Sequence, residues 1–133
     1  MINEANLFRS CIIIYLVERH PIFASIIQSK LEALENVTLT ISPLVRLEVL
    51  VKPLREKQTA LITLYERFLS EQQSLTMPNP VFDVALSLRV EHNLKTPDAL
   101  HLATAQYHDC KYFWTNDNRL SAIVPGLVVN VCS

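Results

Sequence analysis

The stretch LKTPDALHLATA, residues 94–105, carries the clearest local structural signal in the chain. Thr96-Pro97 predicts the start of a helix. A capping side chain followed by proline suits the first helical position, where an N–H would have no partner in any case. Asp98 then lies in the first turn, where unpaired N–H groups and the helix dipole favour a carboxylate. Because the same signal recurs at Ser42-Pro43 and Asn79-Pro80, three helices are expected to begin in this way.

The remaining apolar pattern alternates between short strand-like runs and longer helical periods. We expect one strand to end near Phe8 and Arg9, and further strands over residues 37–41, 111–115 and 127–131. Further helices are expected over residues 10–18, from Pro21 onward with Ile22, Ile26, Ile27, Leu31 and Leu34 on one face, and over residues 54–71 with Leu61, Leu64 and Phe68 facing inward. Strands separated by helices imply parallel pairing with right-handed crossovers. The pattern therefore predicts an α/β fold with a central parallel sheet of four or five strands and helices on both faces.

The composition indicates a single domain over residues 1–133 and excludes several classes of protein. Half of the residues are hydrophobic, which is enough to form a full core at this length. Glycine occurs once, so the glycine-rich phosphate loops of Rossmann and P-loop proteins are excluded. The net charge of -1 gives no general attraction to nucleic acid or to a membrane. Three cysteines without a C-x-x-C pair or a signal peptide favour reduced thiols, no zinc and a cytoplasmic location.

Acidic residues occur where the predicted strands end, which is where parallel sheets bind ligands. Asp117 follows the strand expected at residues 111–115, and Asp98 opens the helix at Thr96-Pro97. Glu48 lies between Leu47 and Val49 in an apolar helix, where a lone acid is costly unless it is paired or bound to a metal. Asp98 by itself is equally well explained as a favourable residue for a helix N-terminus.

The order and spacing of these segments resemble the PIN-domain family. Residues 94–105 look like the third acidic motif of that family, Thr115-Asn116-Asp117 resembles its fourth, and the segment from Ser42 to Glu48 is similar to its second. Residues 12–18 resemble the helix that follows the first motif. The resemblance covers the chain from about Leu7 onward and is greatest to the VapC-type toxins of bacterial toxin–antitoxin pairs. It implies a PIN-like three-layer α/β/α domain.

The resemblance also implies an activity. It assigns Glu48, Asp98 and Asp117 as catalytic residues and ligands of Mg²⁺ or Mn²⁺ in an endoribonuclease, with Ser10, Thr115 and Asn116 in support. Hard divalent cations prefer such oxygen ligands, and they activate water and stabilise charge on a phosphate. The implied partners are an RNA substrate, a small antitoxin and a second copy of the chain. The apolar helix over residues 22–34 is a candidate dimer surface.

Arg9 departs from the family pattern, because it stands where the first motif has an aspartate. One interpretation is that its guanidinium forks onto Asp98 or Asp117 and substitutes for both the missing ligand and the metal. A second is that Arg9 points to solvent while the three acids still bind metal weakly. A third is that position 9 has been substituted. Two functional hypotheses follow: an active or impaired ribonuclease, and a degenerate PIN domain that binds a protein or RNA without cutting it.

Two further features have ordinary structural explanations beside functional ones. His101 follows Asp98 by three positions and could carry a proton, although a packed and hydrogen-bonded histidine is the more common arrangement in an apolar helix. Lys52, Arg55 and Lys57 form a basic group that is either a solvated helix end or a contact for RNA phosphates.

Overall fold

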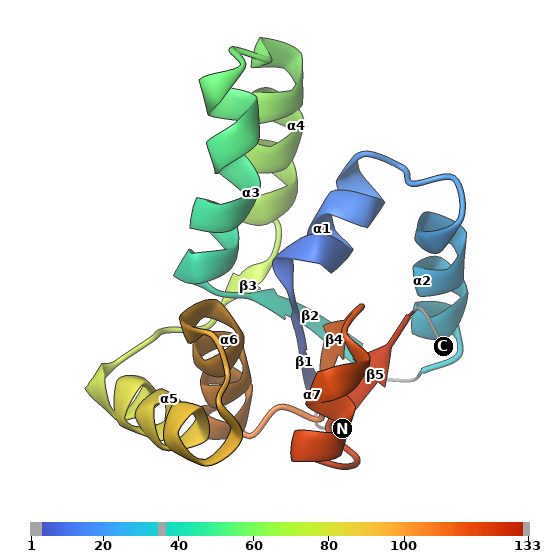
Figure 1. Cartoon of the computed structure of the whole chain (residues 1–133). Coiled ribbons are helices and arrows are strands. Elements are labelled where there is room, and N and C mark those ends of the chain that lie inside the picture. Colours follow the sequence, from blue (N-terminus) through green and yellow to red (C-terminus); the bar gives the residue numbers. More distant parts are fainter. Residues whose placement is uncertain (1–3, 35–36, 132–133) are drawn as a thin grey trace.

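The computed structural model describes residues 4–34 and 37–131 (Figure 1). The elements along the chain are β1 (Glu4–Phe8), α1 (Ser10–Val17), α2 (Phe23–Glu32), β2 (Val37–Ile41), α3 (Pro43–Arg55), α4 (Thr59–Ser70), β3 (Gln73–Ser74), α5 (Asn79–His92), α6 (Thr96–Tyr107), β4 (Tyr112–Thr115), α7 (Asn118–Ile123) and β5 (Val128–Asn130). The four strands named from the sequence are all present, and their ends agree to within a residue or two. The two-residue strand β3 was not predicted, because its exposed polar residues carry no strand signal.

The five strands form one parallel sheet in the order β3-β2-β1-β4-β5. The expected α/β fold with a central parallel sheet is therefore confirmed. β1 lies in the middle, with Leu7 opposite Thr40 on one side and Phe113 on the other. Since all strands run the same way, the residues that follow β1, β2 and β4 meet at one edge of the sheet.

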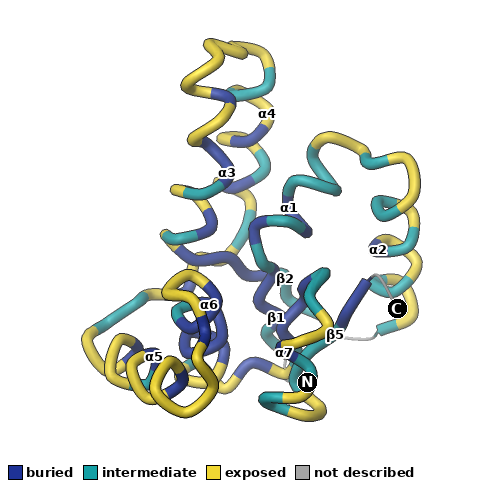
Figure 2. Tube along the Cα trace, in the orientation of Figure 1, coloured by how far each residue is buried: buried dark blue, intermediate teal, exposed yellow. Residues whose placement is uncertain are grey.

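Successive strand residues point to opposite faces of the sheet, and each face has its own core. Leu7 and Phe113 pack with buried residues of α5, α6 and α7. Phe8 and Trp114, one position later in each strand, pack with buried residues of α1, α2, α3 and α4. The rings of Phe8 and Trp114 stack at 4.9 Å between centroids. This alternation produces the three layers, and the strands form the buried centre in Figure 2.

The helical region between β2 and β3 differs from the prediction. The single amphipathic stretch expected over residues 54–71 is divided, because α3 continues through Pro53 to Arg55 and α4 begins at Thr59. Leu64 is exposed, whereas Tyr65 and Leu69 form the buried side of α4. The inward-facing set was therefore wrong for Leu64. Figure 1 shows α3 and α4 as a pair that extends away from the sheet.

The helix at residues 22–34 also differs in detail. α2 begins at Phe23, and Ile22 precedes it with 60 % of its surface exposed. Ile27 is fully buried, while Ile26, Leu31 and Leu34 are half-buried. The apolar residues of this segment therefore do not form one exposed face, and the dimer surface expected here stays a prediction. Among the helices of the described ranges, none is long and apolar enough to cross a membrane.

Only one of the three predicted proline helix starts has its capping side chain in place. The Ser42 hydroxyl accepts from the backbone N–H of Val45 at 3.4 Å. α5 and α6 each begin one residue earlier than predicted, so that Asn79 and Thr96 lie inside the helix and make no side-chain cap. A capping residue must precede the first helical residue, and the extended Pro78 and Lys95 occupy that position instead.

We predict that Ser42→Ala lowers the free energy of unfolding by about 1 kcal/mol, because it removes the acceptor of an otherwise unpaired buried N–H. Thr96→Ala, at an exposed residue that makes no cap, should change it by less than about 0.5 kcal/mol. Urea unfolding followed by the fluorescence of Trp114, the one tryptophan of the chain, measures both. Equal losses for the two variants would contradict this assignment of the caps.

Candidate functional site

The carboxyl edge of the sheet brings together side chains from five segments. Arg9 directly follows β1, and its backbone N–H donates to the carbonyl of Trp114 in β4 at 3.1 Å. Thr115 ends β4, and Asp117 caps α7 by accepting from the N–H of Arg119. Asp98 lies in the first turn of α6, and Glu48 lies in the second turn of α3.

Arg9 does not point to solvent. Its Nη2 forms an ion pair and a hydrogen bond with Oδ1 of Asp98, and its Nη1 donates to Oγ1 of Thr115 at 3.5 Å. The side chains of Arg9 and Asp98 are only 19 % and 6 % exposed. A carboxylate buried this deeply needs a compensating charge. The structure therefore shows the first interpretation considered for Arg9, in which its guanidinium pairs with an acid, and that acid is Asp98.

Arg119 is a second cation at this edge, and the sequence analysis missed it. Its Nη2 lies 2.6 Å from Oδ2 of Asp117, its Nε lies 3.0 Å from Oδ1, and its Nη2 lies 3.7 Å from Oδ2 of Asp98. The hydrogen bonds and positive charge of Arg119 hold the pKa of Asp117 below its ordinary value. The sequence did contain a signal for this contact, namely an arginine two residues after a helix-capping aspartate. At that spacing the guanidinium can reach back to the capping carboxylate.

Glu48 is held by two hydrogen bonds to the same oxygen. The hydroxyl of Ser10 donates to Oε1 at 2.5 Å, and Nε2 of His101 lies 2.6 Å from Oε1. Burial favours the neutral acid, but these hydrogen bonds and the nearby positive charges outweigh it, so the pKa of Glu48 lies below its ordinary value. His101 is fully buried, and its Nδ1 has no hydrogen-bond partner. The expectation of a packed, hydrogen-bonded histidine is confirmed, and its partner is Glu48.

The two other predicted supporting residues lie in different surroundings. Oγ1 of Thr115 accepts from Arg9 and also from the backbone N–H of Asp117 at 3.2 Å, so that it joins β1 to the start of α7. The side-chain amide of Asn116 donates to the hydroxyl of Tyr15 in α1 at 2.9 Å. Thr115 therefore belongs to the contact network of the acids, whereas Asn116 anchors the turn to α1.

The acids as they stand do not fit a divalent ion. Such an ion needs several free oxygens around one point at about 2.0–2.6 Å. Arg9 engages Oδ1 of Asp98, Arg119 spans both oxygens of Asp117, and Oε1 of Glu48 accepts from Ser10 and His101. Within residues 4–34 and 37–131, no three Asp, Glu, His or Cys side chains are placed to share a metal ion. Three carboxylates and two guanidinium groups leave one net negative charge here.

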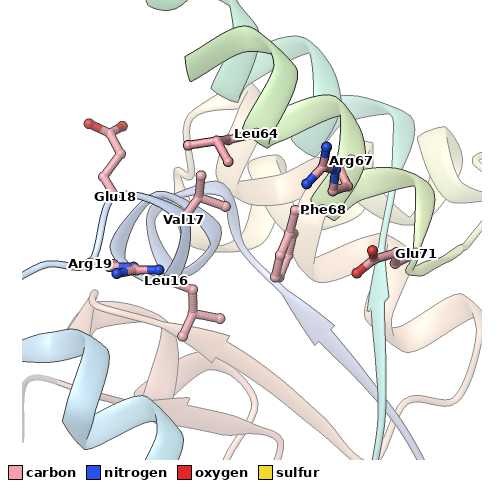
Figure 3. A pocket seen from close by; sticks show the side chains of 8 residues that line it. All are labelled: Leu16, Val17, Glu18, Arg19, Leu64, Arg67, Phe68 and Glu71. Atoms are coloured by element: carbon pink, nitrogen blue, oxygen red, sulfur yellow. The ribbon is translucent and has the colours of Figure 1, made fainter. Parts of the chain in front are cut away.

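A groove of about 410 Å³ lies between α1 and α4 (Figure 3). Leu16 and Val17 at the end of α1 face Leu64 and Phe68 of α4 across it. Its charged lining consists of Glu18, Arg19, Arg67 and Glu71. An apolar floor with a charged rim of both signs is typical of a surface that binds an amphipathic helix.

We predict that the pairing of Arg9 with Asp98 is energetically stronger than an ordinary surface ion pair. A double-mutant cycle with Arg9→Ala and Asp98→Ala should give a coupling energy of about 2 kcal/mol or more, since each single variant leaves a largely buried charge without its main partner. The matched cycle at Arg46 and Glu66, whose side chains are 58 % and 46 % exposed, should give at most about 1 kcal/mol. Similar couplings in urea unfolding would contradict the assignment of Arg9 as the main counter-charge of Asp98.

Comparison with known proteins places the chain in a family. The model of the PIN domain matches residues 10–124. No curated protein matches the chain.

Solved structures with the same fold come from toxin–antitoxin systems. A toxin–antitoxin complex from Klebsiella pneumoniae is 28 % identical with a TM-score of 0.75, covering 95 % of this chain and 97 % of that one. VapBC2 from Rickettsia felis, bound to a DNA fragment from its promoter, is 22 % identical with a TM-score of 0.77, covering 95 % and 98 %. VapC20 from Mycobacterium tuberculosis, a toxin that cleaves the sarcin–ricin loop, is 11 % identical with a TM-score of 0.72, covering 89 % and 94 %. The chain belongs to the PIN-domain family.

Proposed function

We propose that this chain is the toxin of a toxin–antitoxin pair, an endoribonuclease whose cleavage of RNA is impaired because Arg9 replaces the first acidic ligand. The observation that carries the proposal is the set of three acids at the carboxyl edge of a PIN-domain sheet, with Arg9 bound to one of them. The similarity to the Klebsiella pneumoniae complex and to VapC20 supports the toxin role and an RNA substrate.

The proposed catalytic and metal-binding residues are Glu48, Asp98 and Asp117. They are the residues that would hold Mg²⁺ or Mn²⁺ once an acid replaced Arg9, and the ion would then supply an activated water and stabilise charge on a phosphate. A cation approaching Asp98 meets the fixed charge of Arg9, at a cost of about 4 kcal/mol per unit charge of the cation at ~4 Å and an effective dielectric of ~20. One unit of charge alone corresponds to roughly a thousandfold loss of metal affinity, so this is the least loss that a divalent ion would meet.

A second candidate function is a PIN domain that binds a partner without cutting RNA. The observation that favours it is that each of the three acids already has a hydrogen-bonding partner within the chain. The two candidates differ in whether the chain as written retains measurable metal-dependent cleavage.

We further propose a small antitoxin as the protein partner and the cytoplasm as the compartment. The groove between α1 and α4 is the candidate surface for an amphipathic antitoxin helix, because Leu16, Val17, Leu64 and Phe68 offer it an apolar floor. Cys11 and Cys110 are free thiols, as a reducing compartment requires.

We also propose a homodimer, through a surface other than the one expected from the sequence. Phe82, Leu86 and Val90 lie four residues apart on α5 and are 51 %, 63 % and 77 % exposed. A row of large apolar side chains at this spacing is costly to leave in water and is typical of a helix that packs against another protein. A second copy of the chain offers the same row, as a twofold interface requires.

We predict that Arg9→Asp increases both Mn²⁺ affinity and RNA cleavage, by roughly three orders of magnitude in affinity if Arg9 stays in place in the original chain. Arg9→Ala should recover part of the metal binding with less cleavage, because it removes the repulsion but supplies no ligand. Mn²⁺ titration calorimetry beside a cleavage assay on structured RNA measures both properties.

The matched control is Lys111→Asp, which makes the same charge change at an exposed residue directly before β4, at the opposite edge of the sheet. It should leave metal affinity and cleavage at the level of the original chain. If the original chain binds Mn²⁺ as tightly as Arg9→Asp and cuts as fast, the impairment by Arg9 is wrong. If Arg9→Asp binds the ion but cuts no RNA, the binding-module function is favoured.

We predict that Leu86→Glu converts the dimer into a monomer, because it places a charge in the centre of the α5 row. Ile22→Glu, at an equally exposed isoleucine before α2, should leave the dimer intact. Light scattering coupled to gel filtration gives the mass of each variant. Dissociation by Ile22→Glu alone would favour the surface at residues 22–34 instead.

A further inference from the structure

A separate pocket of about 300 Å³ lies between α1, α3 and α4 and borders the acid cluster. Its polar lining comprises Glu18, Glu48, Lys52 and Gln58, and its apolar walls include Ile14 and Leu61. Glu48 belongs both to this pocket and to the hydrogen-bonded group with Ser10 and His101. A ligand in the pocket is therefore in direct reach of the carboxyl edge of the sheet.

We propose that this pocket binds a guanine base of the RNA strand whose backbone lies along the acid cluster. The proposal rests on the proposed ribonuclease function and names a base preference for it. The volume lies at the lower end of the ~300–1,000 Å³ of small-molecule sites, which suits one flat heterocycle. Apolar side chains on facing helices can contact the two faces of the ring, while polar groups at the rim contact its edge.

Glu18 is the group that selects guanine. The Tyr65 hydroxyl donates to Oε2 of Glu18 and fixes the carboxylate at the pocket. A carboxylate has about four acceptor sites on two oxygens, so it retains acceptors for a ligand. Guanine presents two neighbouring donors, the ring N1–H and the exocyclic amine, which match the two oxygens of a carboxylate. Adenine, cytosine and uracil lack this pair, because each places an acceptor beside its donor.

Lys52 completes the match. Its exposed ammonium group lines the same pocket and is a donor for the guanine O6, the acceptor beside N1–H. The lining carries one net negative charge, so a cationic side chain of a protein partner is the main competing occupant. A guanine base is the occupant that uses the ammonium group as well as the carboxylate, because it offers an acceptor beside its two donors.

The test is the affinity of the purified full chain for fluorescent pentanucleotides UUGUU, UUAUU, UUCUU and UUUUU, in EDTA to prevent cleavage. We expect UUGUU to bind about tenfold more tightly than the others, which corresponds to ~1.4 kcal/mol. Glu18→Gln should reduce this preference to less than about threefold, because an amide presents only one acceptor, and it should leave the affinity for UUUUU unchanged. Glu91→Gln, the same change at an exposed position on α5, should leave the preference intact.

Tyr65→Phe keeps the ring and the Glu18 carboxylate but removes the hydroxyl that orients it, so it should weaken the preference for UUGUU less than Glu18→Gln does. An unchanged preference in Glu18→Gln, or equal affinities for all four oligomers, would overturn the guanine site and leave the ribonuclease function standing. No binding to any oligomer would overturn the guanine site as well, whereas the ribonuclease function is decided by the Mn²⁺-dependent cleavage of Arg9→Asp. Displacement of UUGUU by N-acetyl-argininamide at lower concentration than by guanosine 3′-monophosphate would assign the pocket to a cationic side chain.

Discussion

The ion pair between Arg9 and Asp98 governs the chemistry that the carboxyl edge of this sheet can perform. Asp98 is 4 % exposed at the start of α6, where a carboxylate cannot remain charged without a partner. In a site built for a divalent ion, the ion supplies the positive charge. Here a side chain of the chain itself supplies it, so the carboxylate is already compensated before any cation arrives.

All three acids at this edge have partners within the chain, but these partners differ in how firmly they are held in place. Arg9 is largely buried and anchored through its backbone to β4, whereas Arg119 is 68 % exposed on a six-residue helix. An exposed guanidinium exchanges easily with water, so Asp117 is the acid that can most readily be released. Glu48 is oriented by a hydroxyl and a buried imidazole rather than by a cation. Residue 9 therefore supplies the firmest of these compensations, and Asp98 is the acid that depends on it.

The architecture around the site follows from ordinary sheet geometry. Because Leu7 and Phe113 face one layer of helices and Phe8 and Trp114 the other, both layers are held to the same two central strands. The pair α3 and α4 extends beyond the sheet and packs against α1, which creates one groove with an apolar floor and one pocket with a polar lining. The proposed binding surfaces for a protein and for RNA therefore flank the same helix, α1.

Local sequence was sufficient for four of the five strands, since β-branched and aromatic runs such as residues 37–41 and 112–115 favour strands. The order and spacing of the acidic motifs together, including the one at residues 94–105, were sufficient to indicate the family and to single out Asp98. The helix caps at Asn79 and Thr96 and the inward placement of Leu64 in α4 were wrong, because a shift of one residue, or a neighbouring helix, decides which side chain is used. Only the tertiary structure placed Arg9 on Asp98, brought Arg119 to Asp117 and set His101 against Glu48. The first and third of these pairs join residues far apart in the chain, and the second depends on how a turn closes. A buried charge needs a partner, but the partner comes within reach only once the strands have paired.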